Sequence, residues 1–317
     1  MSRCLYCYAP IKEENNFLYH KKCSKKFFGF EIPPILPFAK SELKEVAKKI
    51  IKRSVTVPGV QTKLSLQIEK NLEEGNRFTL VGLWGNYILK PPVEKYPELP
   101  ENEDLVMHLA ELFRIRTVPH ALIPLKSGEL AYISRRIDRT RKNEKIQMED
   151  LCQLSERLTE DKYKGSMEQV VKKVKKFSSN PMLDVLTLFE ITLFSFLTGN
   201  ADMHLKNFSL IFEHNFYMLA PAYDLLSTRL VISERDDPEE SALTLNGKKS
   251  NFKRIDFEIF SNKIGLNEKQ VNNVFKKFER IFPTALDFID KSFLSDSKKE
   301  EFKELIKSRR IRLNFQL

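Results

Sequence analysis

Alternating apolar and polar residues predict strands over much of residues 31–145. In "VQTKLSLQIE" the apolar side chains Leu64, Leu66 and Ile68 occupy every second position, which is the spacing of a half-buried strand. The following "NLEEGN" is typical of a turn, and "WGNYILK" predicts a strand that ends at Lys90, before two prolines. In "PENEDLVMHLAELFRI" the apolar positions recur three and four residues apart, as on one face of a helix. We therefore expect a small sheet with one helix.

From about residue 146 onward the apolar spacing is helical and is interrupted once. Residues 184–198 are nearly all apolar and predict a helix that is buried on most sides, which Gly199 can end as a C-cap. This run is too short to cross a bilayer and contains Glu190, so we expect no membrane association. The interruption comes next, where "FSLIF" and "FYMLA" predict two short strands that "EHN" joins as a hairpin.

A polar cluster, "ADMHLKN", separates the buried helix from the hairpin. The antiparallel return of the hairpin should bring Asp224 close to Asp202 and Asn207. The order Asp202-x₄-Asn207, hairpin, Asp224 is typical of a phosphoryl-transfer site. In such a site Asp202 would take the proton of the acceptor hydroxyl, while Asn207 and Asp224 would bind Mg²⁺ through hard oxygen ligands.

A phosphoryl-transfer site also needs a loop over the phosphates and a lysine on a strand. The segment "SVTVPGVQTK", residues 54–63, offers a Pro-Gly turn that enters a strand. Lys90 ends "YILK" at a position suited to face a cleft, and Glu103 on the following helix is placed to hold it. Taken alone, Lys90 is equally compatible with an ordinary exposed strand lysine.

Composition indicates a folded protein with an ample core, because the chain has 317 residues of which 42% are hydrophobic. The net charge is +10, but the basic runs "KKVKKF" and "KSRRIR" have helical spacing and carry no nucleic-acid-binding motif. We interpret them as solvated helix faces and keep a weak surface for DNA or an acidic partner as the alternative. No apolar secretory signal opens the sequence, so we expect a cytoplasmic protein.

The first thirty residues hold three of the four cysteines. Cys4-x₂-Cys7-x₁₂-His20-x₂-Cys23 has the spacing of two paired zinc ligand sets. A cytoplasmic chain would not use these cysteines as disulfides. The sequence therefore favours a structural Zn²⁺ site, and the alternative is a small metal-free hairpin with reduced thiols. The fourth cysteine, Cys152, fits a buried helix position.

Over about residues 50–230 the chain resembles HipA-family serine/threonine kinases, the toxins of bacterial toxin–antitoxin operons. The segments that carry the resemblance are, in order, "GVQTKLSL", "YILKPP", "ENE", "ISRRIDR", "MEDLCQ", "LTGNADMHLKNFSLI" and "LAPAYDLLST". The resemblance implies an α+β, two-lobed protein-kinase-like fold that binds ATP. On this basis we expect a Cys/His-rich element over residues 1–30, a strand-rich N-lobe over 31–145 and a helical C-lobe over 146–317.

The resemblance also implies roles for individual residues. Asp202 is the catalytic base, His204 lines the ATP/Mg²⁺ site with Asn207 and Asp224, and Lys90 contacts the phosphates. The phosphate loop contains Gly59, Val60, Gln61 and Lys63, and the backbone from Arg135 to Ile137 forms the adenine hinge. At this hinge Arg135 departs from the acidic residue that the family pattern suggests.

Partners are implied as well. Fewer residues precede the phosphate loop here than in full-length members, which is similar to the short HipT type. In that type a separate small protein that resembles the missing subdomain serves as antitoxin, beside a helix-turn-helix antitoxin that binds DNA. The implied substrate is an aminoacyl-tRNA synthetase, and contact with DNA is indirect. Two alternatives remain, a small-molecule phosphotransferase and a catalytically inactive, DNA-bound corepressor.

Ser54 and Thr56 alternate in "RSVTVPG", just before the phosphate loop. Their spacing alone is that of two strand residues with solvent-facing hydroxyls. The resemblance places Thr56 at the position of a regulatory autophosphorylated serine, with Ser54 as the second hydroxyl of the motif. Phosphorylation would add about −1.5 to −2 charges beside the ATP phosphates and repel the loop.

Overall fold

The structure is a computed structural model that describes residues 2–11, 18–51, 62–70, 75–82, 84–140 and 142–315, without the side chains of 47–51. The chain divides into two compact units. The first comprises Met1–Asp104, Val118–Lys145 and Lys291–Phe293, and the second comprises Leu105–Thr117, Ile146–Asp290 and Leu294–Leu317. Each unit has its own sheet and its own helices, and the two are described separately.

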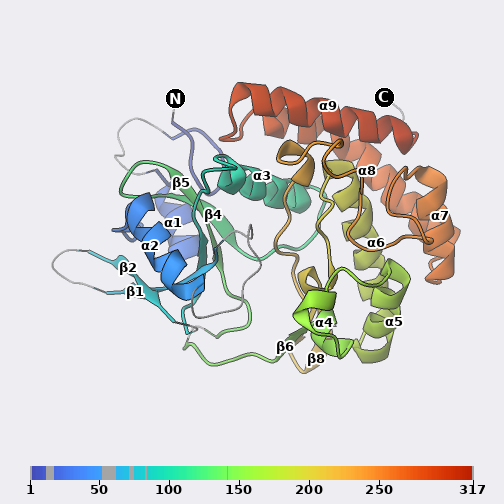
Figure 1. The fold of residues 1–317 in the computed structure, drawn as a ribbon, viewed down its shortest axis with the longest axis horizontal. Coiled ribbons are helices and arrows are strands. Elements are labelled where there is room, and N and C mark those ends of the chain that lie inside the picture. Colours follow the sequence, from blue (N-terminus) through green and yellow to red (C-terminus); the bar gives the residue numbers. More distant parts are fainter. Residues whose placement is uncertain are drawn as a thin grey trace. The chain divides into compact units, whose positions relative to one another are not determined.

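The first unit contains a five-stranded antiparallel sheet (Figure 1). Its elements are α1 (Lys21–Phe28), α2 (Lys40–Ile51), β1 (Leu64–Glu69), β2 (Arg77–Val81), β3 (Tyr87–Lys90), the start of α3 (Leu99–Leu112), β4 (His120–Pro124) and β5 (Leu130–Arg135). The strands lie in the order β2-β1-β3-β5-β4, and every neighbouring pair is antiparallel. The predicted strands ending at Glu69 and Lys90 and the predicted helix are present.

The expectation of one helix beside a small sheet was wrong for residues 31–145, because α2 and three further strands accompany the predicted elements there. Helix α1 lies before this range. The side chains of Phe27 on α1 and Leu43 on α2 enter the same apolar cluster as Leu66 and Leu89 of the sheet. The extra helices are therefore formed because one sheet face has a wide apolar surface that needs cover.

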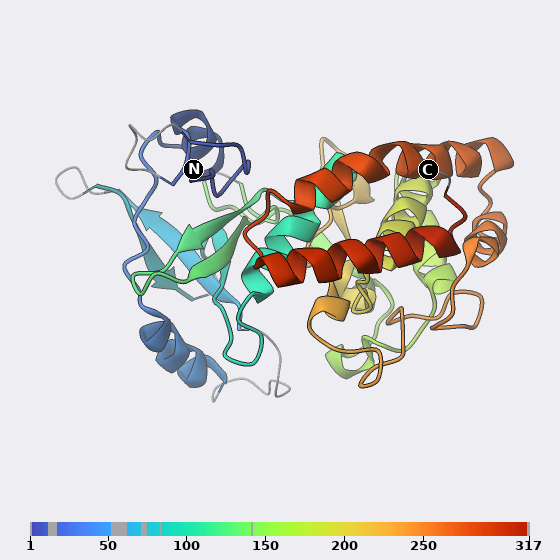
Figure 2. The ribbon, with the colours of Figure 1, turned by 90° about the horizontal axis from the view of Figure 1, so that it is seen from above.

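The second unit is mostly helical. Its elements after α3 are β6 (Met148–Asp150), α4 (Leu151–Leu154), η1 (Thr159–Asp161), α5 (Met167–Phe177), α6 (Pro181–Thr198), η2 (Leu205–Asn207), β7 (Ser209–Glu213), β8 (Phe216–Leu219), η3 (Thr228–Leu230), α7 (Arg254–Lys263), α8 (Glu268–Ile289) and α9 (Asp296–Arg312). The helices α8 and α9 run side by side (Figure 2). The predicted hairpin is β7–β8.

The prediction of a helical region with a single interruption was incomplete, because residues 146–253 contain a further strand. Strand β6 pairs antiparallel with β7, so the small sheet has three strands in the order β6-β7-β8. Asp150 ends β6 and caps α4 by accepting from the backbone N–H of Gln153 at 2.8 Å. Because three residues are too few for a measurable alternation, β6 gave no signal in the sequence.

Helix α6 is the buried centre of the second unit. Val185, Leu188 and Phe194 are fully inaccessible to solvent. Among the described residues α6 alone has the length and apolarity of a membrane span, with a mean hydropathy of 1.5, and 61% of it is buried inside the protein. Its composition is accordingly that of a core helix, for which an apolar surface on most sides is expected.

Gly199 ends α6 in the left-handed conformation, with φ 68°. The backbone N–H of Asn200 returns to the carbonyl of Ser195 at 2.8 Å, which closes the C-cap. A Cβ on Gly199 would lie 2.7 Å from a Leu305 methyl carbon and 3.0 Å from Arg229 Cγ. Both the backbone conformation and the close approach of α9 therefore require glycine here.

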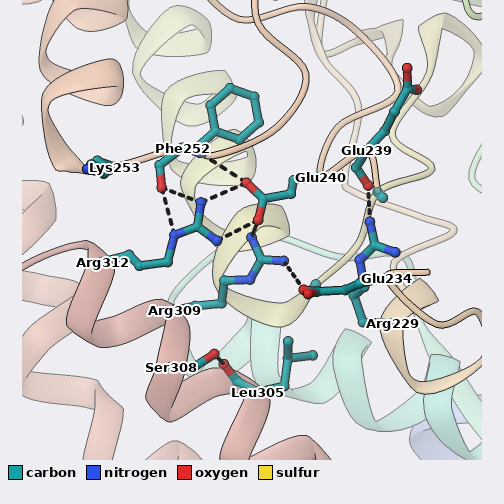
Figure 3. Close-up of polar contacts among 12 residues, drawn as sticks. Arg229, Glu234, Glu239, Glu240, Phe252, Lys253, Leu305, Ser308, Arg309 and Arg312 are labelled. Carbon is teal, nitrogen blue, oxygen red and sulfur yellow. Dashed lines mark hydrogen bonds and ion pairs between the residues drawn. The ribbon is translucent and has the colours of Figure 1, made fainter. Parts of the chain in front are cut away.

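An ionic cluster ties α9 to the segment that precedes α7 (Figure 3). The Glu240 carboxylate accepts hydrogen bonds from Arg309 and Arg312, the latter at 2.5 and 2.8 Å, and from the Phe252 backbone N–H at 3.0 Å. Burial raises the pKa of Glu240, but these hydrogen bonds and the two guanidinium charges outweigh it and lower that pKa. The cluster is therefore strongest above the ordinary carboxyl pKa and weakens as the pH falls below it.

We predict that Gly199→Ala destabilises the protein more than Gly247→Ala. Both glycines have a left-handed φ, 68° and 79°, but a Cβ on Gly247 would meet nothing within 4 Å. Gly247→Ala should thus cost only the conformational term of about 1–2 kcal/mol, whereas Gly199→Ala adds a clash with α9. Urea unfolding of the two variants measures the difference, and equal losses would contradict the packing constraint at Gly199.

Candidate functional site

The loop between α6 and β7 is held by hydrogen bonds among its own residues. The Asn207 side chain donates to the Asp202 carbonyl at 2.9 Å, and the His204 backbone N–H donates to the same carbonyl at 2.8 Å. The Asn200 side chain accepts from the Asp202 backbone N–H at 3.2 Å. Because Asn207 donates its amide nitrogen to the loop, its side-chain oxygen is the atom left for a ligand.

Tyr163 is a site residue that the sequence did not reveal. Its hydroxyl donates to the Asp202 carboxylate at 2.9 Å, and its ring meets the His204 ring edge-on with centroids 5.1 Å apart. Burial, with the charge and hydrogen bond of Asp202, raises the pKa of Tyr163 above its ordinary value. Tyr163 lies 39 residues before Asp202 and in no motif, so only the fold brings the two together.

The segment after the hairpin returns to this loop, as the sequence predicts. Tyr223 donates to the Lys206 carbonyl at 2.9 Å, and its hydroxyl lies 2.5 Å from that of Ser209. The next residue, Asp224, has a left-handed φ of 56°. An aspartate tolerates this conformation better than most residues, and such backbone outliers concentrate at functional sites.

The imidazole of His204 is buried, with 6% of its surface exposed. Burial lowers the pKa of His204, and the charges of Asp202 and Asp224 oppose the shift without reversing it. Its Nδ1 has no hydrogen-bond partner among the residues that the structure describes. His204 is therefore a buried, neutral imidazole at pH 7, within the electrostatic reach of both carboxylates.

Two carboxylates and one amide oxygen thus come from a single loop and the segment after the hairpin. Carboxylate and amide oxygens are the ligands that Mg²⁺ prefers, so Asp202, Asn207 and Asp224 carry side-chain atoms of the right type to hold it. An ion pair, Lys206 with Asp150 at 2.7 Å, anchors the loop to the end of β6. The arrangement suits binding a metal–phosphate group beside a carboxylate that can accept a proton.

In the first unit Lys90 and Glu103 form the ion pair expected from the sequence. Their charged atoms are 2.5 Å apart, and the side chains are 5% and 1% exposed. The Lys90 ammonium also lies 5.3 Å from the centroid of the Tyr132 ring on β5. Lys90 is therefore buried and held from two sides, which excludes the ordinary exposed strand lysine.

Of the other predicted binding residues of this unit, the structure describes some and not others. Lys63 is exposed just before β1, while Arg135 and Ile137 are half-buried at and after the end of β5. The Arg135 backbone N–H donates to the Pro119 carbonyl at 2.9 Å. The remaining predicted positions, Ser54, Thr56, Gly59, Val60 and Gln61, lie outside the described residues.

The four Cys/His side chains of the N-terminal element lie together. The sulfur or nitrogen atoms of Cys4, Cys7, His20 and Cys23 are all within 4.8 Å of one another. Cys4 is buried and the other three are half-buried. The sequence spacing thus predicted a real cluster in space.

Comparison with known proteins gives a family. A family model described as the HipA-like C-terminal domain matches residues 55–286. A Haemophilus influenzae protein named "Putative kinase" is 29% identical over 265 residues, which is 75% of each chain. Two Sinorhizobium fredii proteins, "Putative kinase Y4mE" and "Putative kinase Y4dM", are 31% and 33% identical over 55% and 57% of this chain. The match spans 42% and 47% of their own lengths.

Two solved structures share the fold. The HipA toxin of Shewanella oneidensis MR-1, solved with HipB and operator DNA, has a TM-score of 0.67 and 23% identity, and the match covers 84% of this chain and 70% of HipA. The Helicobacter pylori proinflammatory kinase CtkA has a TM-score of 0.55 and 17% identity, over 78% of this chain and 93% of CtkA. The expected α+β, kinase-like fold is thereby confirmed.

We predict that His204 titrates below the ordinary histidine value of about 6.5. Because the Asp224 carboxylate raises the pKa of His204, Asp224→Asn should lower that pKa further. Two-dimensional ¹H–¹⁵N NMR of the imidazole nitrogens during a pH titration of the wild-type chain and the variant measures both values. An unchanged or raised His204 pKa in Asp224→Asn would mean that Asp224 does not act on this imidazole.

Proposed function

The chain belongs to the family of HipA-like C-terminal domains, and on this premise we propose that it is a toxin serine/threonine protein kinase of a bacterial toxin–antitoxin system. The single observation that carries the proposal is the loop of Asp202 and Asn207 followed by the hairpin return to Asp224. These three side chains have the types and order that phosphoryl transfer from Mg·ATP requires.

Each residue has a role in the proposed reaction. The oxygen of a protein hydroxyl attacks the γ-phosphorus, its proton passes to the Asp202 carboxylate, and the bond to the ADP oxygen breaks. Asn207 and Asp224 would hold Mg²⁺, which would neutralise charge on the phosphates. We propose that His204 and Lys90 bind the nucleotide and its phosphates.

The adenine and phosphate-loop assignments belong to the same proposal. The backbone from Arg135 to Ile137 would bind the adenine, and Gly59, Val60, Gln61 and Lys63 would cover the phosphates. The buried ion pair between Lys90 and Glu103 supports it, because kinases of this type hold their strand lysine with a helix glutamate.

The partners that we propose follow from the kind of toxin. A HipA relative of the same fold was solved with HipB and its operator DNA. By analogy we propose a helix-turn-helix antitoxin as the DNA-binding partner, and a second, small antitoxin as in the HipT type. The proposed substrate is an aminoacyl-tRNA synthetase, whose phosphorylation in the cytoplasm would stop translation.

We predict that Asp202→Asn lowers phosphoryl transfer to protein by about 10²–10⁴-fold, because the variant lacks the proton acceptor. Asp224→Asn should abolish transfer and also weaken Mg·ATP binding, which Asp202→Asn should spare. The assay is incubation with γ-labelled ATP and a bacterial protein extract, followed by mass spectrometry of phosphoserine and phosphothreonine. The matched control is Asp236→Asn, an exposed aspartate hydrogen-bonded to Ser233 in the same unit.

The assay also separates the alternatives. Label that appears in small molecules and not in protein would replace the protein kinase with a small-molecule phosphotransferase. Full transfer by Asp202→Asn would refute the base assignment. An absence of transfer by the wild-type chain, together with antitoxin-dependent DNA binding, would favour the inactive corepressor.

A second prediction concerns self-regulation at Ser54 and Thr56. We propose that active protein phosphorylates one or both residues and that the phosphate, at about −1.5 to −2 charges, repels the ATP phosphates. Peptide mapping after incubation with Mg·ATP should find the modification in the wild-type chain and none in Asp202→Asn. Modification that is equal in both proteins, or absent from both, would contradict autophosphorylation at this motif.

A further inference from the structure

The N-terminal element is defined here as residues 2–11 and 18–28. It places four potential metal-ligand side chains close together, and none of them belongs to the proposed kinase site. Cys4 and Cys7 come from a tight loop in which the Tyr8 backbone N–H donates to the Cys4 carbonyl at 2.9 Å. His20 is the N-cap of α1, and Cys23 lies in the first turn of that helix. The cluster thus has the loop-plus-helix form of a closed, four-ligand site.

The distances agree with those of a zinc ion and its ligands. Tetrahedral Zn²⁺ has Zn–S bonds of about 2.3 Å and Zn–N bonds of about 2.0–2.1 Å, which place sulfur and nitrogen about 3.6 Å apart. His20 Nδ1 lies 3.4 Å from Cys7 Sγ and 3.7 Å from Cys23 Sγ. All four ligand atoms are within 4.8 Å, so only small side-chain shifts complete the tetrahedron.

The other nitrogen of His20 is oriented as in known zinc sites. His20 Nε2 lies 3.1 Å from the Pro10 carbonyl oxygen, to which it donates when Nδ1 carries the lone pair. A hydrogen bond of this kind fixes the tautomer and the ring orientation of a metal-bound histidine. Nδ1 is thereby directed at the three sulfur atoms as an unprotonated ligand.

The backbone conformation of the residue after Cys7 is unfavourable. Tyr8 has a φ of 60°, which a bulky residue rarely adopts, and its side chain is fully buried. The Tyr8 hydroxyl donates to Asp104 at 2.7 Å, and Asp104 also pairs with His120 at 2.6 Å. The strained backbone at Tyr8 therefore accompanies a buried contact with Asp104, the residue of α3 that follows Glu103.

Further contacts join the element to the sheet. The Leu122 backbone N–H on β4 donates to the Leu5 carbonyl at 3.1 Å, and the Tyr19 hydroxyl donates to the Leu122 carbonyl. The Phe27 ring of α1 meets the Tyr87 ring at the start of β3, with centroids 5.9 Å apart. Tyr87 begins the four-residue strand that ends at Lys90.

We propose that Cys4, Cys7, His20 and Cys23 bind one structural Zn²⁺, which folds the N-terminal element onto β3, β4 and the first turns of α3. Binding releases the thiol protons to solvent and leaves three thiolates and a neutral imidazole on the metal, with a net charge of −1. Four lysines, Lys21, Lys22, Lys25 and Lys26, lie on the same helix as Cys23, so the local sequence is basic. The zinc site is thus a support for the Lys90–Glu103 pair.

The test is metal analysis of reduced protein purified without chelator. Wild-type protein should contain about one zinc per chain, and Cys4→Ser with Cys7→Ser should contain almost none. The matched control is Cys152→Ser, because Cys152 is a buried cysteine of α4 outside the cluster, and this variant should keep its zinc. His20→Cys should keep it too, since four thiolates also bind zinc.

Cobalt gives an independent result on the unmodified chain. Co²⁺ added to metal-free wild-type protein should produce the intense visible absorption of a tetrahedral ion with thiolate ligands, and the spectrum should change in His20→Cys. Wild-type protein without zinc and without this spectrum would overturn the site. Undiminished zinc in the Cys4/Cys7 variant would overturn the ligand assignment. If that variant does not fold, the cobalt spectra and the His20→Cys variant decide the question.

The supporting role has its own readout. Removal of zinc should lower the melting temperature by about 5 °C or more. Hydrogen exchange should increase in peptides from β4 and from the start of α3, while α8 in the second unit stays protected. Exchange that is unchanged at β4 and α3 after zinc removal would contradict the proposed support of the Lys90–Glu103 pair.

Discussion

The left-handed turn at Gly199 determines how the second unit holds its polar loop. Helix α6 must be buried because its surface is apolar on most sides, and it must end before the charged residues that follow. The Thr228 hydroxyl donates to the Gly199 carbonyl and accepts from the Ala201 backbone N–H, both at 2.9 Å. The chain that returns from the hairpin is thereby fixed to the start of the loop, four residues after Asp224.

The contacts around Gly199 extend to the C-terminal helix. Arg229, which packs against Gly199, donates to the backbone carbonyls of Asp237 and Glu239, and the next residue, Glu240, binds Arg309 of α9. Arg309 is 2% exposed. Buried ion pairs gain little net stability because both charges lose water, but they admit few alternative arrangements. The same holds for the buried pair of Lys90 and Glu103 in the first unit.

The sequence predicted the parts of the site that depend on local order along the chain. Gly199, the hairpin and the sequence Asp202, Asn207, Asp224 follow one another within 26 residues, so their relation could be derived from short-range geometry. The solvated face predicted for "KKVKKF" is present, since Lys172, Lys175 and Lys176 are exposed. The same interpretation was wrong for "KSRRIR", because Arg309 is buried and, with Arg312, binds Glu240. Tyr163 and the Glu240 cluster could not be predicted, because their partners are 39 and about 70 residues distant.

We propose that Asn207 and Asp224 hold the metal of a metal–nucleotide complex, with Asp202 beside the phosphate to be transferred. The most direct measurement is anomalous X-ray scattering from Mn²⁺, in place of Mg²⁺, in crystals of the chain with a non-hydrolysable ATP analogue. The account predicts a manganese peak bound by the Asn207 side-chain oxygen and the Asp224 carboxylate, with the Asp202 carboxylate facing the γ-phosphate. A nucleotide and manganese bound elsewhere, with these three side chains uninvolved, would contradict it.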